Sequence, residues 1–231
     1  LDEAVLGADA IFVTGPVLKQ RTYAMVLGGH LNDDQVVVIA PGRTLGAVET
    51  AWYLRVGGNS SAISIIELQS LPFWVDDQGG TLYLTETGPV TTAVLPSSNT
   101  GVLRTMAALI PNLVPVASVL HSGFGDASGL VEIVGLTLGG LALQDGQTPL
   151  PAGAEPLESR RVFRTLLGQR HSRIVTTLAT ERRAVAARWG VRNLPSTDEW
   201  LDRFAGTMTG TMVRPMPKPN QADDLIRCAT M

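Results

Sequence analysis

The sequence predicts an α/β fold in which a parallel sheet is followed by a domain of helices. Residues 11–13 form a short apolar run, and residues 36–40 form a second run that contains no polar residue. Between them, apolar residues recur at roughly the helical period, so the predicted order is strand, helix, strand. A run without polar alternation is typical of a strand covered on both faces, which favours a parallel sheet.

The predicted elements follow one another in a simple order up to residue 97. Residues 1–9 indicate the end of a helix, and Pro16 suits the first position of the next helix, which Gly28-Gly29 ends. Thr44 is predicted to cap a further helix. Three more strands are expected at residues 62–67, 82–85 and 91–95, the last two joined as a hairpin.

Helical periodicity dominates after residue 97. We therefore predict two domains, an α/β domain over residues 1–97 and a helical domain over residues 98–231. A capping box from Ser196 to Glu199 predicts the start of one of the later helices. A long helix ends at Gly190, and its apolar face is predicted to carry Phe163, Leu167, Ile174, Leu178, Val185 and Trp189.

Composition excludes several classes of function. A net charge of -3 without a long basic run gives no reason to expect a nucleic-acid partner. No uncharged apolar stretch is long enough to span a membrane. The single cysteine, Cys228, fits a reducing compartment, and we expect a cytoplasmic protein. No metal site is expected, because His30, His121 and His171 lie far apart without a second ligand at helical spacing.

Two turns form the first candidate site. Thr14-Gly15-Pro16 and Pro41-Gly42-Arg43 follow the first two strands, and ligands of open α/β sheets bind beyond the carboxyl ends of the strands. Arg43 can bind a carboxylate or phosphate, or pair with a local acid, and Glu67 at the end of another strand is equally open. His121 ends an apolar segment, where it either exchanges a proton or is a buried histidine bonded to a backbone carbonyl.

Four segments resemble the octopine/nopaline type of opine dehydrogenase. They are V-T-G-P at residues 13–16, A-P-G-R-T-L-G-A at residues 40–47, E-L-Q-S-L-P-F at residues 67–73 and A-T-E-R-R-A-V-A at residues 179–186. The resemblance implies the C-terminal half of a Rossmann-type doubly wound sheet, followed by an all-α domain. A G-x-G-x-x-G turn is absent from the 231 residues, so we expect a longer protein whose beginning is missing.

The resemblance also implies an activity. Opine dehydrogenases condense an amino acid with a 2-keto acid and reduce the imine with NADH or NADPH, using a histidine that corresponds to His121 as general acid/base. Asp223 and Asp224 are candidates for binding substrate or for partnering that histidine, and Arg43 for binding substrate. The implied cofactor-binding residues are Thr14, Gly15, Pro16, Pro41, Gly42, Arg43 and Glu67.

Two alternatives to this activity stay open from the sequence, and so does the role of the long helix. One is a related two-domain NAD(P)-dependent reductase of a hydroxy or keto acid. Another is a relative of these enzymes without catalysis, which serves as a binding or assembly subunit. The long helix with Phe163 and Trp189 either packs within its domain or forms the surface of a homodimer.

Overall fold

The computed structural model describes residues 1–78, 81–86, 89–134, 137, 160–197 and 199–200. They form two compact units, of which the first runs from Leu1 to Gly123 and the second begins at Phe124. The strands of unit 1 are β1 (Ala10–Val13), β2 (Val36–Ile39), β3 (Ser64–Leu68), β4 (Phe73–Gln78), β5 (Thr81–Glu86), β6 (Val90–Leu95) and β7 (Leu113–Pro115). Its helices are α1 (Asp2–Val5), α2 (Val17–Leu27), the 3-10 helix η1 (Gly28–His30), α3 (Gly46–Val56), α4 (Thr100–Leu109) and the start of α5 (Val119–Gly125). Unit 2 contains the end of α5, α6 (Ser128–Val134) and α8 (Arg160–Arg188).

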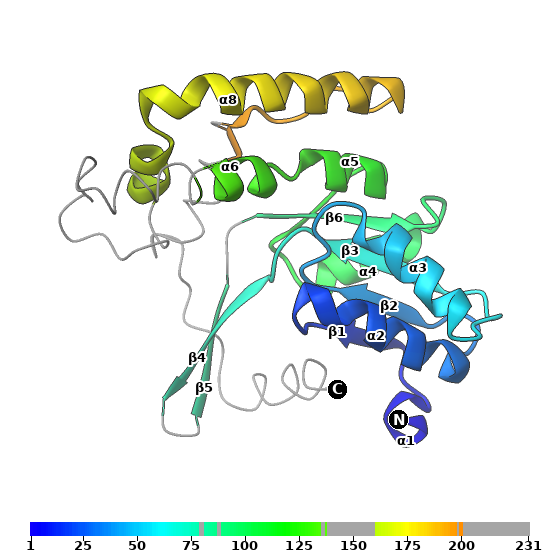
Figure 1. Ribbon diagram of the computed structural model, residues 1–231. Coiled ribbons are helices and arrows are strands. Elements are labelled where there is room, and N and C mark those ends of the chain that lie inside the picture. The colour runs from blue at the N-terminus through cyan, green and yellow to red at the C-terminus, as the bar shows by residue number, and fades with distance from the viewer. Residues whose placement is uncertain (79–80, 87–88, 135–136, 138–159, 198, 201–231) are drawn as a thin grey trace. The chain divides into compact units, whose positions relative to one another are not determined.

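Unit 1 is built on a five-stranded sheet in the order β1-β2-β3-β6-β7. The first three strands are parallel, with Val13 opposite Ile39 and Ile39 opposite Glu67. β6 runs antiparallel to β3, and β7 runs parallel to β6. Helices α2 and α3 lie on one face of the sheet and α4 lies on the other (Figure 1). The predicted α/β fold with a parallel strand-helix-strand start is therefore confirmed.

The apolar run of β2 is explained by its central place in this sheet. Val37, Val38 and Ile39 have no exposed surface. Val37 and Ile39 join the apolar cluster that includes residues of α2 and α3, whereas Val38 joins the cluster beside α4. Because successive side chains of a strand point to opposite faces, a strand between two layers of helices needs apolar residues at every position.

The predicted hairpin between residues 82–85 and 91–95 is wrong. β5 pairs with β4, in a two-stranded sheet of its own, and β6 pairs with β3 and β7. Residues 90–94 of β6 are all buried, as expected for an inner strand of the main sheet rather than one arm of an isolated hairpin. Hairpin prediction relied on the intervening Gly88-Pro89, which identifies a turn but not the strands that pair across it.

Unit 1 extends further along the chain than the predicted boundary near residue 97. The three-residue strand β7 was not predicted, and the compact unit ends at Gly123. Leu103 and Met106 of α4 are buried in one cluster with Leu113 of β7. The helix at residues 100–109 therefore belongs to the same unit as the sheet, because it covers the sheet face opposite α2 and α3.

In unit 2, α6 packs against the long helix α8. The existence of this helix was predicted. Of the residues predicted for its apolar face, Leu178 is half-buried. Ile174, Val185 and Trp189 are 41%, 50% and 65% exposed. The buried residues of α8 are smaller, which permits a close approach of the helix axes; among the described side chains they are Val175, Ala179 and Ala186. The side chains of Phe163 and Leu167 lie outside the described residues.

The predicted capping box in unit 2 is confirmed. The backbone N–H of Ser196 donates to Glu199 Oε2 at 2.7 Å, and the N–H of Glu199 donates to Ser196 Oγ at 3.1 Å. This reciprocal pair satisfies two of the donors that the start of a helix leaves open. Among the helices that the structure describes, none is both long and apolar enough to cross a membrane.

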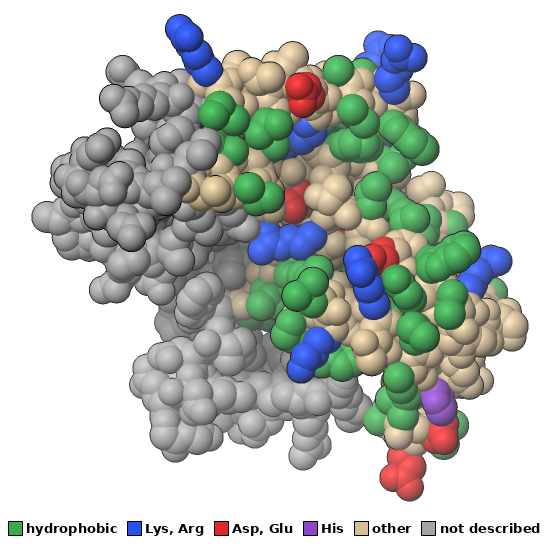
Figure 2. Space-filling view, viewed as in Figure 1, with side chains coloured by type: hydrophobic (Ala, Val, Ile, Leu, Met, Phe, Trp, Pro, Cys, Tyr) green, Lys and Arg blue, Asp and Glu red, His purple; other side chains and the backbone are tan. Residues whose placement is uncertain are grey.

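Apolar side chains also gather on the outer surface of α2 and α3 (Figure 2). Leu18 of α2 and Trp52 of α3 are 87% and 67% exposed. In α2 the buried side is formed by Gln20, Ala24 and Leu27 instead. Apolar residues thus occur on both sides of α2, which is why its sequence pattern alone locates the buried face poorly.

Glycines allow α2 and α3 to meet backbone to backbone. A Cβ atom built on Gly28, directly after α2, would lie 2.3 Å from the carbonyl oxygen of Leu54 in α3. A Cβ on Gly57, at the end of α3, would lie 2.0 Å from the carbonyl oxygen of Met25. Neither position has room for a side chain. This close approach sets the distance between the two helices that cover the front of the sheet.

We predict that Gly28→Ala lowers the free energy of unfolding by about 1–3 kcal/mol, the usual cost of forcing an atom into packed surroundings. Gly29→Ala is the matched control, because its Cβ would lie 3.6 Å from the nearest atom, the carbonyl oxygen of Gly57. We expect this control to be neutral or slightly stabilising. Urea denaturation of both variants measures the difference, and equal midpoints would contradict the close-packing argument.

Candidate functional site

The two glycine-containing turns lie side by side at one edge of the sheet. The N–H of Ala40, after β2, donates to the carbonyl oxygen of Val13, at the end of β1, at 3.1 Å. Gln20 of α2, a buried side chain, donates through Nε2 to the carbonyl oxygen of Pro41 at 2.9 Å. The helix that follows the first turn is thus bonded to the second turn. The structure brings residues 14–16 and 40–43 together, as their places after adjacent parallel strands predict.

The side chain of Glu67 packs against the second turn and bonds to the helix that follows it. Its side chain has no exposed surface, and a Cβ on Gly42 would lie 2.3 Å from Glu67 Cγ, so the turn requires glycine at this position. Glu67 Oε2 accepts a hydrogen bond of 2.8 Å from the backbone N–H of Ala47, in the first turn of α3. A carboxylate at this end of a helix also interacts favourably with the helix dipole. One residue of β3 therefore fixes both the turn and the start of α3.

The predicted cap at Thr44 is wrong. The residue at the capping position of α3 is Leu45, which has a φ of +61° and makes no capping hydrogen bond through its side chain. Arg43 also has a positive φ, of +52°. Both are left-handed conformations, which L-residues with side chains adopt at a cost. The capping carboxylate comes instead from Glu67, twenty residues away in the chain, which leaves Thr44 exposed at the surface of the turn.

The first turn packs against α2. A Cβ on Gly15 would lie 2.5 Å from Cε2 of the Tyr23 ring, so the tyrosine packs directly over the glycine backbone. Thr14 and Pro16 on either side are exposed. The turn therefore presents short side chains and backbone to the solvent at the carboxyl end of β1.

His121 lies in the first turn of α5. Its backbone N–H donates to the carbonyl oxygen of Ser118 at 2.9 Å, and its ring nitrogen Nδ1 lies 2.9 Å from Ser118 Oγ. The imidazole is half-buried. It is therefore held by a polar neighbour while part of the ring stays accessible, which a proton-exchanging group requires.

The start of α5 packs against the second turn. Val119 is buried in the same cluster as Ile39 of β2 and Ala47 of α3. A Cβ on Gly123, two residues after His121, would lie 2.8 Å from the backbone nitrogen of Leu45. These contacts are all within unit 1. The structure thus carries the backbone of His121 to the edge of the sheet where the two turns lie.

The remaining predicted residues are less informative. Arg43 is half-buried, and Asp223 and Asp224 lie outside the described residues. His30 contacts Asp2 Oδ1 through Nδ1, near the other end of α2. The side chain of His171 is not among those described. Of the predicted site, the described structure therefore places the two turns and Glu67 together, and it packs the backbone of α5, which carries His121, against the second turn.

Sequence reasoning missed three residues at this edge, namely Gln20, Gln69 and Ser118. Gln69 Nε2 makes a long contact of 3.5 Å with the carbonyl oxygen of Ser122 in α5. No local signal identifies Gln20 or Gln69, because each bonds to a backbone carbonyl distant in sequence. Ser118 could have been found, since a serine directly before a helix occupies a capping position.

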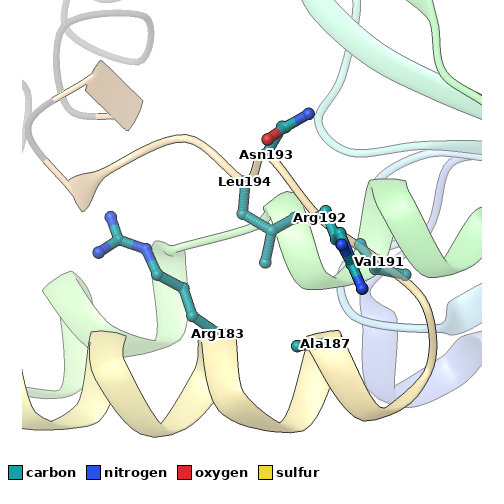
Figure 3. Close-up of a pocket in the computed structure, with 6 residues that line it drawn as sticks. All are labelled: Arg183, Ala187, Val191, Arg192, Asn193 and Leu194. Carbon is teal, nitrogen blue, oxygen red and sulfur yellow. The ribbon is translucent and has the colours of Figure 1, made fainter.

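A separate cavity lies in unit 2. It has a volume of about 290 Å³ and lies between the end of α8 and the segment that follows it (Figure 3). It is lined by Arg183, Ala187, Val191, Arg192, Asn193 and Leu194. None of the predicted site residues contributes to it. Among the described residues, no group of three histidine, cysteine or acidic side chains could hold a metal ion.

The neighbouring Arg182 is partly withdrawn from solvent. Its Nη2 donates to the carbonyl oxygen of Pro195 at 3.0 Å. Burial lowers the pKa of Arg182, Arg183 lowers it further, and Asp126 acts in the opposite direction. The guanidinium thus attaches the segment after α8 to the helix.

Comparison with known proteins supports the predicted resemblance. No family model matches the sequence. The chain is 24% identical over 212 residues to an opine dehydrogenase of Arthrobacter sp. (strain 1C), a match that covers 90% of this chain and 55% of that protein. The chain therefore spans just over half the length of this curated relative.

Two solved structures share the fold. Octopine dehydrogenase in complex with NADH and agmatine superposes with a TM-score of 0.60 at 15% identity, covering 99% of this chain and 64% of that one. The 2-dehydropantoate 2-reductase of Geobacter metallireducens GS-15 gives a TM-score of 0.54 at 13% identity, over 96% and 67% of the chains. The chain thus has a Rossmann-type fold with a helical domain, and its predicted resemblance to opine dehydrogenases is confirmed.

Proposed function

We propose that the chain is part of an NAD(P)H-dependent oxidoreductase of the opine dehydrogenase type, which condenses an amino acid with a 2-keto acid. The observation that carries this proposal is the packing of α5, and with it His121, against the turn after β2. In a Rossmann-type sheet this edge is where the ligand binds. In a dehydrogenase the cofactor carries the hydride, and the protein has to bind the cofactor and supply a side chain that exchanges a proton.

The residues at this edge fit the nicotinamide end of a dinucleotide, either NAD or NADP. Gly15 and Gly42 keep the two turns free of side chains, and Thr14 and Pro16 leave the first turn accessible. We propose that residues 14–16 and 41–43 contact the cofactor chiefly through backbone atoms. When bound, the cofactor supplies the hydride that reduces the imine carbon.

His121 is proposed as the general acid/base. A half-buried imidazole can give a proton to the reacting group in one direction and take it back in the other. Helix α5, which carries His121, packs on the sheet through Val119 and on the segment after β2 through Gly123. The ring is thus prepositioned before any substrate binds, which lowers the entropic cost of proton transfer.

Glu67 is proposed to contribute to cofactor binding indirectly. Because its side chain has no exposed surface, its effect on a ligand must pass through the turn that it supports. Arg43, within that turn, is the proposed contact for a substrate carboxylate, since both substrates carry one and a guanidinium binds carboxylates well. Asp223 and Asp224 stay predictions as substrate contacts.

A second candidate function is reduction of a keto acid without an amino acid. The likeness to 2-dehydropantoate 2-reductase, over nearly the whole chain, favours this alternative, because the two enzyme types share the fold. The two candidates make different demands on the substrates. An opine dehydrogenase consumes the cofactor only when both an amine and a keto acid are present.

The proposed setting of the enzyme follows from composition. A single cysteine supports a reducing compartment, and we propose the cytoplasm. The proposed partners are an amino acid and a 2-keto acid. A homodimer stays a prediction.

We expect the full-length protein to oxidise NADH or NADPH when it is offered a 2-keto acid together with an amino acid. A panel of both cofactors, several keto acids and several amino acids, followed by absorbance of the reduced nicotinamide, tests this. Consumption with the keto acid alone would favour the second candidate function. If no combination consumes either cofactor, the proposal of an enzyme is wrong.

We predict that His121→Ala lowers kcat by roughly two to four orders of magnitude, the usual contribution of general acid/base catalysis. The dissociation constant of the reduced cofactor should change little, because the hydride donor is held by the turns. His30→Ala is the matched control, because the His30 ring contacts Asp2, near the other end of α2. Turnover retained in His121→Ala would assign the residue a structural role.

We predict that Glu67→Gln lowers the free energy of unfolding by about 1–3 kcal/mol, because an amide weakens the charge-assisted bond to Ala47 N–H and buries an additional donor. Glu49→Gln is the control, because Glu49 forms a surface ion pair with Arg21 at 2.7 Å, and such pairs contribute at most about 1 kcal/mol. Thermal denaturation compares the two. Equal effects of both substitutions would contradict the supporting role of Glu67.

A further inference from the structure

We propose that Ser118 is a positioning residue, which holds the His121 imidazole so that Nε2 is the nitrogen that exchanges protons. This inference deepens the proposed function and rests on it for the role of His121. Its starting point is the distance of 2.9 Å between Ser118 Oγ and His121 Nδ1. Both residues lie within unit 1, so the contact is internal to one compact body.

Ser118 stands at the capping position of α5. Its carbonyl oxygen accepts the backbone N–H groups of His121 at 2.9 Å and Ser122 at 3.1 Å, which begins the helix. A serine at this position usually turns its hydroxyl to a backbone N–H of the first helical turn. Here the hydroxyl instead bonds to the imidazole, at the third residue of the helix. The serine therefore orients a side chain rather than only terminating a helix.

The bond determines which ring nitrogen is available. Nδ1 is engaged by the hydroxyl, and in the described part of the chain no other polar contact of the His121 ring is recorded. Nε2, on the far side of the ring from the backbone, is left for a substrate. A half-buried ring with one nitrogen engaged can exchange a proton at the other.

The hydroxyl suits both forms of a working histidine. If Nε2 accepts a proton, the neutral ring must carry its own proton on Nδ1, which donates to Ser118 Oγ. Once Nε2 is protonated, the imidazolium keeps the same Nδ1–H donor and the same acceptor. Because a hydroxyl oxygen can accept in either case, the ring changes charge without rearranging its partner. With Nε2 as the nitrogen that accepts the proton, the neutral ring carries its proton on Nδ1, and the Ser118 hydroxyl supplies the acceptor for it.

The tautomer can be measured without substrate or cofactor. Nitrogen chemical shifts of the neutral His121 ring, identified by the signals lost in His121→Gln, distinguish a proton on Nδ1 from one on Nε2. We expect Nδ1–H in the wild-type protein and a shift toward Nε2–H in Ser118→Ala. Ser118→Gly removes the hydroxyl at little cost to the helix start and should behave alike. Ser118→Thr retains a hydroxyl and should keep the wild-type tautomer.

Kinetics provide the second readout on the full-length protein. Ser118→Ala and Ser118→Gly should lower kcat about 10- to 100-fold, by analogy with the range seen when the hydrogen-bond partner that orients a metal-binding histidine is removed. KM should change much less than kcat, because the substitution leaves the proposed substrate contacts in place, and Ser118→Thr should recover most of the turnover. Ser98→Ala is the matched control, because Ser98 also precedes a helix but bonds to Asn99 at 3.3 Å.

The outcomes separate this inference from the proposed function. Nε2–H in the wild-type ring, or one tautomer shared by the wild type, Ser118→Ala and Ser118→Gly, would overturn the inference. A lower kcat in Ser118→Thr equal to that of Ser118→Ala would also overturn it. Absence of any nicotinamide oxidation by the wild type would instead remove the proposed function, while the tautomer would still report whether Ser118 orients the ring.

Discussion

The interaction on which the site depends most is the buried contact of Glu67 with the second turn. Its carboxylate accepts the N–H of Ala47, and its Cγ fills the space beneath Gly42. The turn between them contains two residues with positive φ, Arg43 and Leu45, whose conformations cost about 1–3 kcal/mol each. A strained turn persists only where its surroundings fix it, and a charge-assisted bond in a buried place provides such a restraint.

The same turn determines where His121 lies. Leu45 ends the strained segment, and Gly123 of α5 packs against the Leu45 backbone. The turn that β3 holds in place is therefore also the surface on which α5 packs. Val119 adds an apolar contact to the cluster under α3. Glycine at position 123 is needed for this approach, since a Cβ would meet the Leu45 nitrogen at 2.8 Å. The position of the candidate general acid/base is thus a consequence of packing that starts at Glu67.

Local patterns predicted what local physics controls. The run Val36–Ile39 identified a strand covered on both faces, and Ser196 with Glu199 identified a capping box. Pairing between distant segments was not predictable in this way. The partners of β6 are β3 and β7, and β7 has only three residues. For α8, large apolar residues suggested one face, whereas the buried residues among its described side chains include small ones such as Ala179 and Ala186.

The role of Glu67 illustrates why the site could be located but not explained from sequence. An acid at the end of a strand is compatible with a ligand contact and with a helix cap, and only the fold decides which donor it meets. A similar ambiguity applied to His121, which sequence placed in a helical domain. In the structure His121 belongs to the unit that carries both turns, because α4, β7 and the start of α5 pack on the sheet. The backbone that carries His121 is therefore held against the second turn by packing within unit 1.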